Sequence, residues 1–133
     1  MTNAAPAVQP KGRLWTGRIL SGLAVLFMLF DATIHVLKPS AVVEALAQLG
    51  YPLRAAVPLG IIELVLIALY LVPRTSVFGA ILLTGYLGGA VAIQMRAGSP
   101  VFETVFPVLF GVIVWAGVYL RQCGLRRVFP LLR

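Results

Sequence analysis

Four long apolar stretches alternate with short polar segments along the chain. They run from about Leu14 to Leu37, Ala55 to Val72, Val77 to Met95 and Val101 to Leu120. Each stretch has 18 to 24 residues, and a helix of that length crosses a hydrocarbon core of about 30 Å. The pattern predicts an all-α membrane four-helix bundle with four transmembrane helices, in which residues 14–120 form the transmembrane domain.

The segment between the first two stretches predicts a shorter helix. Lys38-Pro39 ends the first stretch, because proline disfavours helical backbone in the residue before it. Ser40 can then cap a helix that continues to about Leu49. A helix of about ten residues is too short to cross a bilayer. We expect it to lie in the membrane interface between spans one and two.

The two ends of the chain lack this apolar pattern. Residues 1–13 are small and polar and include prolines, a composition that predicts a disordered cytoplasmic tail. Residues 121–133 carry four arginines and are predicted to form a basic cytoplasmic tail.

Composition supports a membrane protein. Hydrophobic residues make up 60% of the chain and charged residues 11%, and the mean hydropathy is +0.98, whereas soluble domains have roughly 25% charged residues. The net charge of +7 does not indicate a nucleic-acid partner, because no basic face interleaved with aromatic residues is present.

The distribution of basic residues predicts the orientation. Eight fall on one side of the predicted membrane, namely Lys11, Arg13, Arg18, Arg74, Arg121, Arg126, Arg127 and Arg133. Three fall on the other side, namely Lys38, Arg54 and Arg96. Since cytoplasmic segments carry the excess of Lys and Arg, we expect a multi-pass protein of the cell inner membrane with both termini in the cytoplasm.

Ionisable residues inside the apolar stretches are the candidate functional groups. Asp31 and His35 lie four residues apart and share one helix face. Glu63 lies in the second stretch, and both carboxyl groups fall about 9 to 12 Å below the same membrane surface. Because a carboxylate inside a membrane is energetically costly, these groups should have partners or a task.

Three further polar residues belong to the candidate ligand-binding set. Tyr86 falls near mid-membrane in the third stretch, and Gln94 and Arg96 lie at its outer end. We expect a polar pocket in the outer half of the bundle above an apolar inner half. The inner rim would hold interface residues such as Tyr70 and Trp115.

Several tasks for the polar residues remain open at this stage. The carboxyl groups and the imidazole could share protons, coordinate a metal or bind a polar head group. They could also be purely structural, since polar pairs between membrane helices contribute about 0.6 kcal/mol on average. We predict no metal, because the chain lacks the H-x-x-x-H and E-x-x-H spacings.

No catalytic residue can be assigned from motifs. The chain contains no phosphate loop, no dinucleotide fingerprint and no nucleophile with an adjacent base. Its single cysteine, Cys123, excludes a C-x-x-C dithiol. Whether the protein is an enzyme is therefore open, and no cofactor is assigned.

The third stretch is rich in small residues, including Gly85-x-x-x-Gly89. This spacing lets helix backbones approach closely. We favour packing within the monomer, and a homodimer through this face is the alternative.

The sequence also resembles a known family, the DoxX-like four-helix membrane proteins. The resemblance covers most of the chain from Trp15 to about Leu120. It is carried by Asp31, Lys38-Pro39, Gln48-Leu49-Gly50-Tyr51-Pro52, Glu63, Tyr70-Leu71-Val72-Pro73-Arg74-Thr75, the glycine-rich segment from Gly79 to Ala90, and Arg96.

The resemblance implies a compact four-helix bundle but no single reaction. Some relatives are similar to the small subunit of thiosulfate:quinone oxidoreductase, and more distant members look like cargo receptors or assembly chaperones. Many DoxX-like chains have a histidine where this chain has Gln94, and His35 stands where others often carry a different residue. If the family chemistry needs that histidine, this chain has either moved it to another helix or lost it.

Two functional hypotheses follow. In the first, the protein is an accessory or quinone-associated subunit of a membrane oxidoreductase system, with a quinone ligand and a soluble oxidoreductase as partner. In the second, it is a non-enzymatic binder of a lipid or small hydrophobic ligand, or an assembly factor for another membrane protein.

Overall fold

The chain is mainly helical over the residues that the computed structural model describes, 8–131. The elements in chain order are α1 (Lys11–Leu37), α2 (Ser40–Gln48), the 3-10 helix η1 (Leu53–Ala55), α3 (Ala56–Leu71), α4 (Ser76–Ala97), α5 (Val101–Arg121) and α6 (Cys123–Val128). No strand occurs within residues 8–131, so the all-α prediction is confirmed.

Within residues 8–131, four helical segments are long and apolar enough to cross a membrane. They are α1, η1 together with α3, α4 and α5, with 27, 19, 22 and 21 residues. At 1.5 Å per residue these segments are about 29 to 40 Å long, enough to cross a hydrocarbon core. The four predicted spans are therefore confirmed.

The first span begins earlier than the sequence analysis predicted. α1 starts at Lys11 rather than Leu14, since the Pro10 carbonyl accepts hydrogen bonds from the backbone N–H groups of Arg13 and Leu14. Residues 11–13, predicted to be disordered, are thus helical. The rest of that predicted tail falls mainly on residues 1–7, which lie outside the described part of the chain.

The connection after α1 follows the prediction, with one difference at its cap. α1 ends at Leu37 and α2 runs from Ser40 to Gln48. Lys38 adopts the left-handed conformation with φ 52°, which turns the chain before Pro39. Ser40 is the first residue of α2 and makes no capping hydrogen bond, so the predicted cap is wrong.

The basic C-terminal segment contains a short helix that the apolar pattern did not reveal. Within it, α6 follows directly on α5, and the chain then folds back onto α5. The Tyr119 hydroxyl donates to the Phe129 carbonyl and accepts from the Leu131 N–H group, both at 2.9 Å. Residues 132 and 133 of the predicted tail lie outside the described residues.

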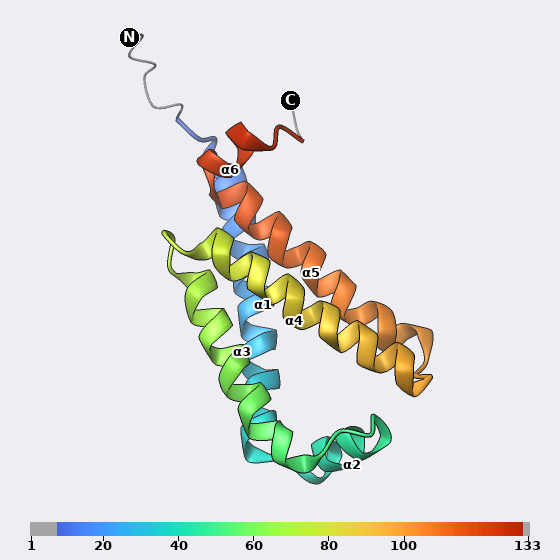
Figure 1. Ribbon diagram of the computed structural model, residues 1–133. Coiled ribbons are helices and arrows are strands. Elements are labelled where there is room, and N and C mark those ends of the chain that lie inside the picture. Colours follow the sequence, from blue (N-terminus) through green and yellow to red (C-terminus); the bar gives the residue numbers. More distant parts are fainter. Residues whose placement is uncertain (1–7, 132–133) are drawn as a thin grey trace.

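Figure 1 shows the four long helices converging at one end and diverging towards the other. Each helix packs on two neighbours, so that the order around the bundle is α1, α3, α4 and α5. We call the converging end, where α6 and both described chain ends lie, the basic end. The opposite end carries α2 and the turn between α4 and α5, and we call it the α2 end.

A buried tyrosine joins three helices near the basic end. Tyr70 on α3 is 1% exposed, and its hydroxyl donates to the Val114 carbonyl on α5 at 2.8 Å. The same oxygen lies 2.9 Å from Ser21 Oγ on α1, and Ser21 is also buried. The prediction of an apolar inner half, with Tyr70 at its rim, is therefore wrong.

Gly79 allows α4 to pack directly on the backbone of α3. A Cβ atom at Gly79 would lie 2.5 Å from the Tyr70 nitrogen and 2.7 Å from Tyr70 Cα. Real Cβ contacts are never this short. The last turn of α3 can therefore meet α4 only if residue 79 has no side chain.

The Gly85-x-x-x-Gly89 motif has no such role within the monomer. Hypothetical Cβ atoms at Gly85, Gly88 and Gly89 meet no described atom within 4 Å. The prediction that this motif packs within the monomer is therefore wrong. Its use in a homodimer stays a prediction.

These two environments predict different effects of the same substitution. Gly79→Ala should destabilise the bundle by about 1–3 kcal/mol, since overpacking forces the backbone apart. Gly85→Ala is the matched control and should have no measurable cost, because it enters open space on the same helix. Thermal unfolding in mild detergent measures both, and equal melting temperatures for the two variants would contradict the described packing.

Candidate functional site

Asp31 and His35 form one side of the candidate site on consecutive turns of α1. His35 Nδ1 lies 2.8 Å from the Asp31 backbone carbonyl and 3.3 Å from Asp31 Oδ2. The side chains are 32% exposed for Asp31 and 19% for His35. The predicted shared face is thus present, and both groups are partly accessible from outside.

Glu63 reaches this pair from α3. Its side chain is among the most buried in the protein, at 2% exposure. One turn earlier, Gly60 lets α3 approach α1 closely, since a Cβ atom there would lie 2.8 Å from the Ala32 carbonyl oxygen. One oxygen of each carboxyl group and one His35 nitrogen consequently lie within 4.8 Å of one another.

Tyr86 adds a third helix to the cluster. Its hydroxyl, on α4, donates to Glu63 Oε2 at 3.3 Å. We call Asp31, His35, Glu63 and Tyr86 the polar cluster. Four of the six residues selected from the sequence therefore meet, and they come from three different helices.

The other two candidates lie outside the polar cluster. Arg96, at the end of α4, donates through Nη2 to the Leu49 carbonyl at 2.6 Å, and so ties the turn after α2 to α4. Gln94 Oε1 is buried without a hydrogen-bond partner among the described residues. No hydrogen bond joins Gln94 or Arg96 to the cluster within the described part of the chain.

A row of phenylalanines begins on α1, one helical turn before Asp31 of the polar cluster. Phe27 is the member on α1, and its ring packs against two phenylalanines on α5. The distance between ring centroids is 5.4 Å to Phe106 and 4.2 Å to Phe110. Phe102 continues the row, 5.6 Å from Phe106. The sequence analysis missed this feature, although the four-residue spacing of the phenylalanines on α5 signals a common helix face.

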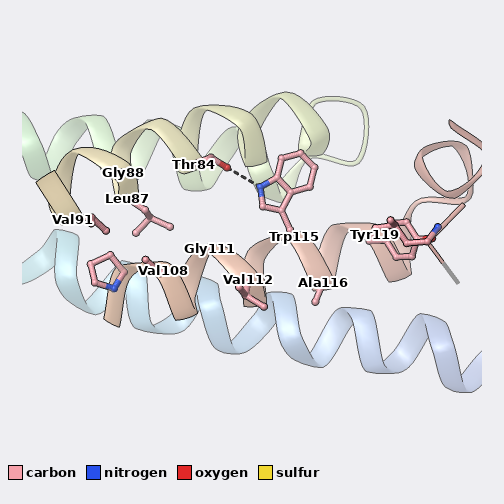
Figure 2. Close-up of a pocket in the computed structure, with 12 residues that line it drawn as sticks. Thr84, Leu87, Gly88, Val91, Val108, Gly111, Val112, Trp115, Ala116 and Tyr119 are labelled. Atoms are coloured by element: carbon pink, nitrogen blue, oxygen red, sulfur yellow. Dashed lines mark hydrogen bonds between the residues drawn. The ribbon is translucent and has the colours of Figure 1, made fainter. Parts of the chain in front are cut away.

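A cavity outside the polar cluster lies between α4 and α5. This apolar groove has a volume of about 570 Å³, and Figure 2 shows the residues that line it. Its lining includes Leu87, Gly88, Val108 and Gly111, and none of the six candidate residues. Across it, Trp115 Nε1 donates to Thr84 Oγ1 at 2.7 Å. The sequence analysis did not predict this groove.

Charge repulsion defines what the polar cluster can do. Two charged carboxylates this close to each other in a membrane repel strongly, so the pair needs a shared proton or a nearby cation. A protonated His35 can supply that positive charge through Asp31. The cluster is therefore suited to binding and releasing protons, and to hydrogen-bonding a polar head group.

The same groups could also hold a divalent cation. Asp31, His35 and Glu63 each offer one ligand atom. Because His35 Nδ1 contacts the Asp31 carbonyl, the nitrogen left for a metal would be Nε2. The prediction of no metal stays a prediction.

The contact between Tyr86 and Glu63 can be tested by a double-mutant cycle. Tyr86→Phe should destabilise the protein by about 0.6 kcal/mol, the average for polar pairs between membrane helices. In a Glu63→Leu background, which lacks the acceptor, Tyr86→Phe should have no effect. Unfolding in detergent gives the four stabilities, and additive effects would show that the two side chains do not interact.

The comparisons with known proteins agree with this architecture. The model of the DoxX-like family matches residues 19–117, a range that includes the polar cluster and parts of all four spans. No curated protein and no solved structure matches the chain significantly. Because the family model covers most of the chain, this protein is a member of the DoxX-like family.

Proposed function

We propose that the protein is a quinone-associated subunit of a membrane oxidoreductase system, with the polar cluster as its quinone site. The observation that carries this proposal is the gathering of Asp31, His35, Glu63 and Tyr86 from three membrane helices. Such a cluster is expensive to bury in a membrane, which makes a functional task the first hypothesis.

Quinone chemistry matches the groups available. Reduction of a quinone to a quinol takes up two electrons and two protons, and its carbonyl oxygens need hydrogen-bond donors. A protonated His35 could donate through Nε2, and the carboxyl groups could exchange protons with the reduced oxygens. The electrons would come from a partner protein, since the sequence contains no motif for a redox cofactor.

The phenylalanine row supports the same ligand. Quinone rings are flat and apolar on their faces, and aromatic side chains pack well against such surfaces. Phe27 lies one helical turn from Asp31, so a ring stacked on it would bring its carbonyl groups towards the polar cluster. The isoprenoid tail would remain in the lipid.

A second function is supported by the apolar groove. Its volume of about 570 Å³ and its apolar lining between α4 and α5 (Figure 2) suit a hydrophobic chain. The protein could then bind a lipid or similar molecule without redox chemistry, or assist the assembly of another membrane protein.

We also propose that the basic end faces the cytoplasm of a cell with an inner membrane. The Gln9 amide donates to Cys123 Sγ and, together with Arg126, holds the pKa of this thiol below its usual value. Since the thiolate is the reactive form, an impermeant maleimide should label Cys123 readily in inside-out vesicles and not in right-side-out vesicles. The reverse result would contradict the orientation.

Co-purification tests the proposed ligand. Protein extracted in mild detergent should carry quinone detectable by mass spectrometry. The Asp31→Asn, Glu63→Gln variant should retain about tenfold less quinone, since hydrogen bonds to charged groups contribute about 1.5–3 kcal/mol. Glu44→Gln, Glu103→Gln is the matched control, because it neutralises two exposed carboxylates outside the cluster.

The outcomes separate the alternatives. Quinone that is lost from the cluster variant and kept by the control supports the proposed function. A bound lipid that both variants retain would favour the groove and the second function. If no molecule co-purifies and the cluster variant only melts earlier, the cluster is structural and the quinone proposal fails.

A further inference from the structure

Charge is strongly separated between the two ends of the bundle. All four acidic residues of the chain, Asp31, Glu44, Glu63 and Glu103, lie in the polar cluster or towards the α2 end. The basic end carries seven described cations, Lys11, Arg13, Arg18, Arg74, Arg121, Arg126 and Arg127. None of the seven forms an ion pair with a described residue, so their charge is not balanced within residues 8–131.

One buried arginine at this end also lacks hydrogen-bond acceptors among the described residues. Arg121 Nε and Nη2 are buried and have no acceptor among the described residues. The guanidinium carbon lies 5.0 Å from the centre of the Tyr70 ring, and a cation–π contact offsets only part of the cost of burying a charged group. The basic end would therefore be stabilised by an anion from outside the chain.

A small pocket at the basic end, lined by arginines other than Arg121, provides a place for an anion. It has a volume of about 190 Å³ and is lined by Gln9, Cys123, Arg126 and Arg127. Arg126 is held in position by hydrogen bonds to the Leu120 carbonyl at 3.2 Å and to Cys123 Sγ at 3.4 Å. Arg127 is exposed, and its side chain makes no hydrogen bond to a described residue, which leaves its guanidinium donors available.

From these observations we infer that the pocket formed by Gln9, Cys123, Arg126 and Arg127 binds the phosphate group of an anionic phospholipid. Guanidinium groups match phosphate oxygens in both charge and geometry. The pocket lies at the end of the membrane-spanning helices, where lipid head groups are found. A lipid is favoured over a free phosphate ion because its acyl chains can also pack on the apolar helices below.

Native mass spectrometry of the full chain in mild detergent tests the inference. The probes are phosphatidylglycerol, phosphatidylethanolamine and inorganic phosphate. The wild-type protein should bind the anionic phosphatidylglycerol more tightly than phosphatidylethanolamine. The Arg126→Gln, Arg127→Gln variant should bind phosphatidylglycerol about 25-fold more weakly, or about fivefold for each cation removed.

The matched control removes two cations from the same end but outside the pocket. Arg13→Gln, Arg18→Gln should keep most of the lipid affinity, which separates the pocket from the general field of the basic end. Arg127→Gln alone is a second test variant, since the Arg127 side chain makes no hydrogen bond to a described residue whose loss could unfold the protein. The affinity of this single variant for phosphatidylglycerol should still be about fivefold lower than that of the wild-type protein.

Three results would overturn the inference. Equal losses in the pocket variant and the control would show that only net charge matters. Equal affinity of the wild-type protein for both lipids would exclude recognition of an anionic head group. Full displacement of the lipid by millimolar inorganic phosphate would identify a site for the free ion instead.

Discussion

The hydrogen-bonded contact around Tyr70 is the constraint on which the bundle depends. A buried hydroxyl inside a membrane must find its partners within the protein, and Tyr70 finds them on α1 and α5. Gly79 brings α4 against the same turn of α3. All four membrane-spanning helices are therefore held together near the basic end, and they can diverge towards the α2 end (Figure 1).

The polar cluster depends on that arrangement. With the helices fixed near Tyr70, the close approach at Gly60 determines how α3 meets α1, and Glu63 then faces Asp31 and His35. Tyr86 completes the cluster from α4. Since one carboxyl group is almost fully buried and the other is a third exposed, the cluster combines a fixed interior group with one that a ligand can reach.

The two ends of the bundle differ in chemistry. The polar cluster and the phenylalanine row make one region suited to a flat molecule with hydrogen-bonding oxygens, which supports the proposed quinone site. Among residues 8–131, the basic end has cations without carboxylates, which supports the proposed binding of an anionic lipid. A protein that works beside a partner enzyme could be held in place in the membrane by a lipid at the basic end, while the polar cluster binds the ligand.

The sequence by itself determined the class of fold, the four spans and the membership of Asp31, His35 and Glu63 in one region, because apolar length and helical spacing are local properties. The tertiary structure alone decided that Tyr86 joins the cluster whereas Gln94 and Arg96 do not. It also decided that Tyr70 and Gly79 are packing residues and that Gly85 is not. Which side of a nearly uniformly apolar helix faces its neighbours depends on contacts between helices, and hydropathy in a membrane carries little of that information.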